Sequence, residues 1–178
     1  LTTTPFDGQS GGVIAFRATG TVLVDGGSIN ADGIGYRGGE TGRFSDCDAF
    51  QGESYGGLGA GEGNGSCNAY NEATGQWAAN FGGGGAHITG AGGNHAGGAT
   101  NGDSWNGGGY TPPYAGFTYG TPDLSTLFFG SGGGGVWNGS PGNPGPGGDG
   151  GGIIYIGSEA IETTSATTIS SKGMSTSN

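Results

Sequence analysis

Alternation of side chains predicts β-strands at the start of the chain. Between Val13 and Val24, one face gathers apolar residues while the opposite face mixes apolar and polar ones. Gly20 interrupts the run and indicates a turn or bulge between two short strands. Asp25-Gly26-Gly27 then predicts a turn before a third short strand at 28–31. The apolar face comprises Ile14, Phe16, Ala18, Val22 and Val24, and the other face Val13, Arg17, Thr19, Thr21 and Leu23.

The same pattern returns near the other end of the chain at an offset of 140 residues. Gly-Gly-Val-Ile-Ala-Phe at 11–16 aligns with Gly-Gly-Ile-Ile-Tyr-Ile at 151–156, and 28–33 aligns with 168–173. Two copies are too few for a solenoid by themselves, because repeat arrays generally need three or more units to bury a continuous core. We therefore expect 11–33 and 151–173 to pair as adjoining layers of one sheet or sandwich.

Glycine runs dominate residues 34–150, which lie between the two copies. Only 124–129 resembles a strand within this insertion. A structureless segment of this length is anomalous in a compact domain, so we expect the glycine runs to be ordered. The extended left-handed helix with three residues per turn suits them, provided that its amides bond neighbouring segments. A collagen triple helix is excluded because the sequence has no strict Gly-X-Y period.

The predicted fold class is all-β, because no window of a dozen residues both lacks glycine and shows helical apolar spacing. We expect a short-stranded β-sandwich or β-solenoid-like scaffold with a glycine-rich insertion of packed polyglycine-II-type helices. Residues 1–178 form one domain in this interpretation, and 1–10 are an extension that can serve as an exchanged strand.

Composition leaves disorder as the alternative, since the chain has 49 glycines and only 31% hydrophobic residues. Two features argue against it: charged residues make up only 10% of the chain, and aromatic residues reach 10%. Disordered chains are usually poor in aromatic residues.

The formal net charge of −10, with only four Lys and Arg residues, argues against nucleic acid or an anionic membrane as a partner. No apolar run approaches the roughly 20 residues that a membrane-spanning helix needs. An acidic, lysine-poor surface is typical of extracellular proteins, and the segment Leu1–Pro5 resembles a mature terminus left after processing. We expect a secreted or cell-surface location.

Cys47 and Cys67 are the only cysteines, and they lack a second Cys/His pair at zinc spacing. A disulfide is the expected use, which implies an oxidising compartment, and two free buried thiols are the alternative. Closing a loop of this size would stabilise the fold by about 3 kcal/mol.

Segments 11–33 and 151–173 resemble glycine-rich secreted and surface proteins of bacteria, which combine Gly-Gly-Gly, an aliphatic strand and a Thr-Ile-Ser-Ala-Asn-Gly type ending. Segments 82–98 and 119–135 share the likeness. The architecture of strands flanking polyglycine helices is similar to the glycine-rich ectodomain of the anaplastic lymphoma kinase family and to phage adhesins. The resemblance implies a surface, matrix or adhesive role and carries no catalytic residue.

Catalytic chemistry finds little support. His87 and His95 stand in glycine-rich surroundings without a nucleophile-elbow pattern, so we expect no enzyme activity. Asp46, Asp48 and Glu53 can supply oxygen ligands, which makes calcium the only cofactor considered. They lack the continuation of a helical calcium loop, and a solvated acidic loop is the alternative.

Aromatic side chains in the glycine tracts offer a binding chemistry, because exposed rings can stack on sugar faces. The alternative is that the rings cover glycine backbone and supply the missing core. Candidate glycan-binding residues are Trp77, Trp105, Tyr110 and Trp137, and the N-glycosylation pattern occurs at Asn64 and Asn138.

The sequence therefore favours an extracellular structural protein that assembles with copies of itself into a fibre, surface layer or biofilm matrix. Strand addition by residues 1–10 or by the Thr/Ser-rich tail is the expected contact. An adhesin-type module for glycans or a receptor is the alternative, and ice binding is a further one.

Overall fold

A computed structural model describes residues 1–41, 52–55, 119–121, 123, 125–135 and 145–175. These residues form no helix and contain six short strands, so the expected all-β class is confirmed. The strands are β1 (Val13–Arg17), β2 (Thr21–Val24), β3 (Ser28–Asn30), β4 (Ile153–Gly157), β5 (Ala160–Thr163) and β6 (Thr168–Ser170).

Each strand of the first copy pairs in parallel with its equivalent in the second copy. β1 pairs with β4, β2 with β5 and β3 with β6, as the repeat predicted. Val13 faces Ile153 at the expected offset of 140 residues, whereas Thr21 faces Ala160 at an offset of 139. The difference arises because the second copy uses a shorter turn before β5 and a longer turn before β6.

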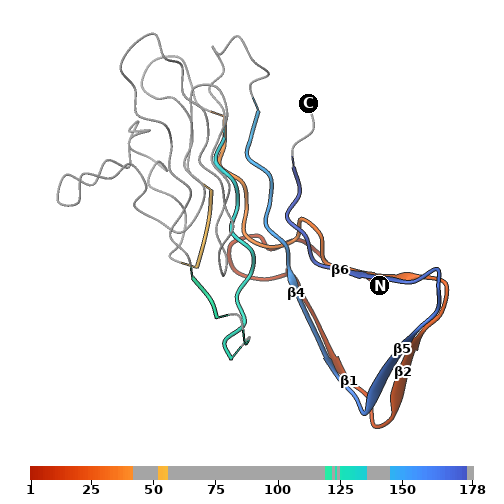
Figure 1. Cartoon of the computed structure of the whole chain (residues 1–178). Helices are drawn as coiled ribbons and strands as arrows, with labels where there is room; N and C mark the ends of the chain where they lie inside the picture. The colour runs from red at the N-terminus through yellow and green to blue at the C-terminus, as the bar shows by residue number, and fades with distance from the viewer. Residues whose placement is uncertain (42–51, 56–118, 122, 124, 136–144, 176–178) are drawn as a thin grey trace, which may run out of the picture.

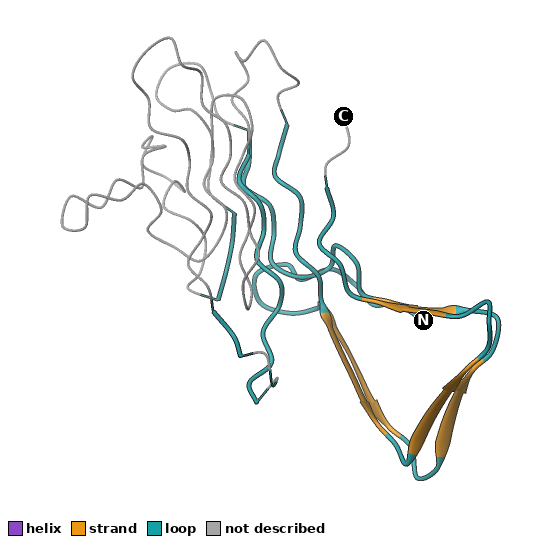
Figure 2. Ribbon diagram, viewed as in Figure 1, coloured by secondary structure: helices purple, strands orange, loops and turns teal. Residues whose placement is uncertain are grey.

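The three strand pairs form the sides of a triangle (Figures 1 and 2). We call residues 13–30 the first coil and residues 153–170 the second coil. Together they are two successive turns of a β-solenoid, and no sandwich is formed by the described strands. The expectation that two copies cannot make a solenoid is therefore corrected: two coils do stack, and the adjoining glycine-rich segments supply further contacts.

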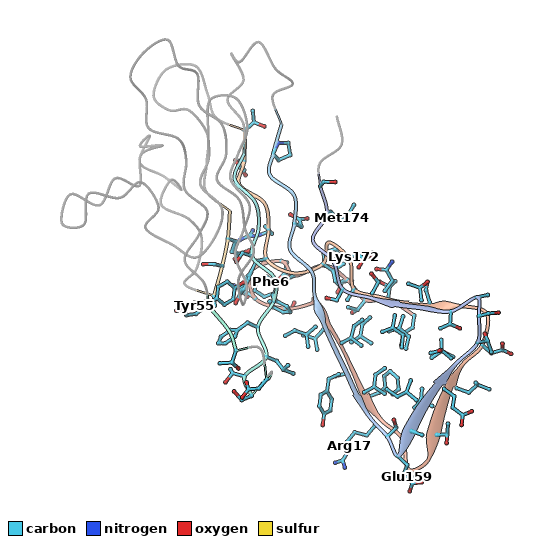
Figure 3. All side chains as sticks on the ribbon, in the orientation of Figure 1. Phe6, Arg17, Tyr55, Glu159, Lys172 and Met174 are labelled. Carbon is cyan, nitrogen blue, oxygen red and sulfur yellow. The ribbon has the colours of Figure 1, made fainter. Side chains whose placement is uncertain are left out.

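The core of the triangle is built from the apolar face that the alternation predicted. Ile14 and Ile29 of the first coil are buried, and side chains from the coils project into the triangle (Figure 3). Burying a side chain of this size contributes roughly 1.5–3 kcal/mol, so a small core still holds the coils together. The buried cluster is Ile14, Ile29, Ala31 and Ile34, packed against Phe16, Val24, Ile154 and Ile156.

The glycine segments beside the triangle are joined by backbone hydrogen bonds with a period of three residues. The amides of Tyr36 and Gly39 donate to the carbonyls of Gly130 and Gly133, so these two segments run parallel. The segment 147–151 runs antiparallel to both: Gly150 and Gly147 donate to Tyr36 and Gly39, while Gly130 and Gly133 donate to Gly151 and Gly148. A three-residue period distinguishes this packing from a β-ladder, whose period is two, and it matches the expected polyglycine-II helix.

Close backbone approach explains why these segments need glycine. Among the segments 35–40, 130–135 and 147–151, an added Cβ atom would overlap a backbone oxygen of another of the three at six positions. Within each segment these positions are three residues apart, in step with the hydrogen bonds. They are Gly35 and Gly38, Gly132 and Gly135, and Gly147 and Gly150.

An aromatic cluster connects the triangle to the glycine segments. The ring of Phe129 lies 4.9 Å from that of Phe6 and 5.2 Å from that of Tyr36, measured between centroids. Gly12 sits beneath the Phe129 ring with a φ of 74°, a backbone conformation that disfavours any side chain. The aromatic rings therefore do cover glycine backbone at this junction.

The strand expected at 124–129 is not observed in its described part, residues 125–129. Successive rings here point to different partners: Phe129 joins Phe6 and Tyr36, whereas Phe128 packs against Tyr55 and Tyr119. The carbonyl of Phe129 accepts a hydrogen bond from the Tyr119 hydroxyl at 2.6 Å instead of from a neighbouring strand. Ring packing and this bond therefore replace the predicted ladder.

Candidate assembly surface

The second coil ends in an open parallel edge. In a parallel ladder, alternate residues direct their backbone groups to opposite neighbours. In β4 the amide of Ile153 donates to Gly12, so Ile154 and Ile156 direct their backbone N–H and C=O away from the first coil. By the same register, the backbone N–H and C=O groups of Ile161, Thr163 and Ile169 are directed away from the first coil, on β5 and β6. No hydrogen bond from another described residue reaches these backbone groups.

The side chains of the same residues point into the triangle, where they remain partly uncovered. Ile29 and Ile169 occupy equivalent places in the two coils, yet Ile29 is 4% exposed and Ile169 is 41% exposed. Ile161 is 47% exposed. A hollow of about 870 Å³ lies over this end of the triangle, and Leu127 and Phe128 line one of its walls.

This combination restricts what can occupy the hollow. A small apolar ligand would cover the isoleucines but would leave the backbone N–H and C=O groups of three strands without partners. A β-strand or a whole coil satisfies both, because it buries the apolar side chains and extends the ladder. The open end of the second coil is therefore best suited to a protein segment in β-conformation.

The opposite edge, on the first coil, is partly covered by the beginning of the chain. The Leu1 nitrogen donates to the Ser28 carbonyl at 2.6 Å, and the Asn30 amide donates to the Leu1 carbonyl at 2.9 Å. Residues 1–10 were expected to be available for exchange, and here they lie on their own chain. The outer edges of β1 and β2 have no described partner; their outward backbone groups belong to Val13, Ala15, Arg17, Thr21 and Leu23.

A polar tie holds the two coils together where they leave β3 and β6. Asp32 Oδ1 accepts hydrogen bonds from the Ser170 hydroxyl and from the Lys172 amide, both at 2.6 Å. The Ser170 hydrogen bond, with the Lys172 amide, holds the pKa of the Asp32 carboxyl below its usual value. This interaction fixes one coil above the other and was not foreseen from the sequence, although Asp32 and Lys172 do align at the repeat offset.

A second charged pair lies among the glycine segments. The Arg37 guanidinium donates to both oxygens of the Glu53 carboxylate, at 2.9 and 3.3 Å, and Glu53 itself is only 5% exposed. The Arg37 amide also donates to this carboxylate, at 3.1 Å. Because Arg37 engages both oxygens of Glu53, the carboxylate serves as an internal partner of this arginine.

Most of the sequence-predicted site residues lie outside the described part of the chain. Asp46 and Asp48 do so, and calcium binding stays a prediction for them, while Glu53 is engaged by Arg37. Among the described residues, no group of three metal-binding side chains occurs. The other predicted residues outside the described part are Cys47, Cys67, Trp77, Trp105, Tyr110, Trp137, Asn64 and Asn138, together with His87 and His95.

Comparison with known proteins gives no relative from which a function could be carried over. No protein-family model, curated protein or solved structure matches the chain. Within the described ranges, no helix is long and apolar enough to cross a membrane.

Proposed function

We propose that this protein is an extracellular structural subunit that assembles with copies of itself into a fibre or surface layer. The observation that carries the proposal is the open end of the second coil. There, a parallel ladder stops with its backbone groups directed outward and its isoleucines 41–47% exposed at Ile169 and Ile161. Proteins normally protect such edges, because an unprotected edge accepts strands from other chains.

The remaining surface supports a structural role rather than a catalytic one. The charge of −10 disfavours nucleic acid and anionic membranes as partners. The described residues form a scaffold held by backbone hydrogen bonds, glycine contacts and ring clusters. Such a scaffold is held by many close contacts without a large apolar core, which suits a repeated building block.

Electron microscopy and light scattering of the purified, oxidised protein over a wide concentration range test the proposal. We expect elongated particles whose length and scattering intensity grow with concentration. Dispersed monomers at millimolar concentration, in the absence of denaturant, would count decisively against an assembling subunit. Fractionation of the source cells, with the protein found in the medium or on the surface, tests the expected location.

A further inference from the structure

The outer edge of the first coil and the open edge of the second coil are the two opposite edges of the same parallel strand pairs. The first coil presents its outer edge at one end, and the second coil presents the open edge at the other. Resting on the proposed function, we infer that the occupant of the open end is the first coil of a second copy. The contact repeats the register that β1–β3 keep with β4–β6, so copies stack head to tail along the axis of the triangle.

Side-chain columns support this register. Inside the triangle, Ile29 stacks on Ile169 and Val22 stacks on Ile161 within one copy. Continuing the stack places the second copy's Ile29 against Ile169 and its Val22 against Ile161. The two isoleucines that are half uncovered in one copy are then covered on the open side as well, and we expect them to be as buried as Ile29 is within one copy.

Charge is compatible with the same register. Outside the triangle, Arg17 stacks on Gly157 and Leu23 stacks on Glu162. A further copy repeats these columns, so each charge has an uncharged residue above and below it. Like charges directly opposite one another would destabilise paired strands, and none of these pairs creates such a contact.

A face-to-face contact between two second coils fits less well. A two-fold axis reverses the path around the triangle, so it can pair only one of the three sides with itself. The other two sides must then pair with each other, although β4, β5 and β6 contain five, four and three residues. Head-to-tail stacking matches every strand with the partner type it already has, and a heterologous contact of this kind generates a filament.

The stacking requires residues 1–3 to leave the outer edge of β3, because Leu1 holds the backbone groups of Ser28 and Asn30. Residues 1–3 can detach from β3 while Thr4 and Phe6 stay bound to the rest of the chain. The Gly12 amide donates to the Thr4 carbonyl at 2.9 Å, and the Phe6 ring packs on Tyr36 and Phe129. Residues 1–3 therefore act as a cap that competes with the incoming copy.

Mixed single-cysteine proteins test the register directly. Thr21 and Ala160 are partners across β2 and β5, and Cα atoms of parallel neighbours, about 4.8 Å apart, lie within disulfide reach. We expect an oxidised mixture of Thr21→Cys and Ala160→Cys proteins to give cross-linked heterodimers. Each variant alone is the control, which also accounts for exchange with Cys47 and Cys67. Assembly without this heterodimer would overturn the stacking while leaving the proposed function standing; absence of any assembly would remove both.

Substitutions at the open end provide the second test. Introduced into the Ala160→Cys protein, Ile161→Lys places a charge in the hollow. The matched control Glu162→Lys changes the neighbouring exposed residue, whose side chain lies on the outside of the same strand. We expect Ile161→Lys to reduce cross-linking at least about tenfold while circular dichroism confirms folding. Removing residues 1–3 should raise cross-linking by about tenfold, since two hydrogen bonds no longer compete. Equal effects of both lysines, or weaker cross-linking after the removal, would contradict the inference.

Discussion

The α-carbon of Gly132 lies directly against the carbonyl oxygen of Arg37, with no room for a side chain between them. We predict that Gly132→Ala lowers the free energy of unfolding by at least about 2 kcal/mol, because the two segments must separate to admit a methyl group. Urea unfolding followed by tryptophan fluorescence measures the effect. Gly27→Ala is the matched control, since nothing lies within 4 Å of its added Cβ, and it should change stability by less than about 0.5 kcal/mol.

Backbone amides of the glycine segments should be protected from hydrogen exchange. We expect slow exchange at Gly35, Gly39, Gly133 and Gly147, each of which donates to a neighbouring segment. Exchange should be much faster at Gly27, which lies on an exposed turn. Amide exchange followed by NMR on the native, oxidised protein gives the rates. Random-coil rates at the four donors would mean that the three-residue hydrogen-bond pattern does not persist in solution.

Loss of the Glu53 carboxylate should destabilise the packing of the glycine segments. Glu53→Gln keeps the shape of the side chain but weakens the hydrogen bonds to Arg37, so we expect a loss of about 1–3 kcal/mol in the free energy of unfolding. Chemical denaturation measures it. Glu40→Gln is the control because Glu40 is exposed. Equal unfolding midpoints for the two variants would show that the Arg37–Glu53 pair adds nothing to stability.

The Asp32 tie predicts a dependence of stability on pH. Because the pKa of Asp32 is lowered in the folded state, its stabilising effect is complete above the ordinary value of 3.8 and is lost as the pH falls through the lower folded pKa. Asp32→Asn should therefore flatten part of the acid limb in a plot of melting temperature against pH. Ser170→Ala should have a similar but smaller effect, since it removes the first of the two donors. An unchanged acid limb in both variants would refute the role of this tie.

The predicted disulfide between Cys47 and Cys67 can be checked by mass. Alkylation of the unfolded, unreduced protein should add no label, and reduction should expose two thiols. Reduction should also lower the free energy of unfolding by about 3 kcal/mol, through the loop that the bridge closes. Two labels without reductant would establish the alternative of free thiols.

The sequence predicts the strands of both coils because their information is local and repeated. Alternation places Ile14 and Phe16 on one face, and the repeat identifies Val13 and Ile153 as equivalent, which the structure confirms as a pair. The open end of the second coil depends on the order in which the coils stack, and the hydrophobic pattern of the sequence does not specify that order. Ile29 and Ile169 look alike in the sequence, and only the order of stacking makes one buried and the other exposed.

The glycine segments were predictable in type but not in partnership. Their composition indicates the three-residue helix, whereas nothing in a run of glycines specifies which neighbour it contacts. The pairing of 36–39 with 130–133 depends on backbone groups that every residue shares. The Arg37–Glu53 pair was missed for a related reason, because Glu53 stands near Asp46 and Asp48 in the sequence, and this proximity suggested a common metal site.

The two coils are contributed by parts of the chain that lie 140 residues apart. During synthesis, β1 to β3 leave the ribosome long before β4 to β6 exist, so the strands of the first coil have no partner strands to pair with. A topology dominated by such distant pairings folds slowly. The three parallel ladders therefore cannot close until residue 170 has been synthesised.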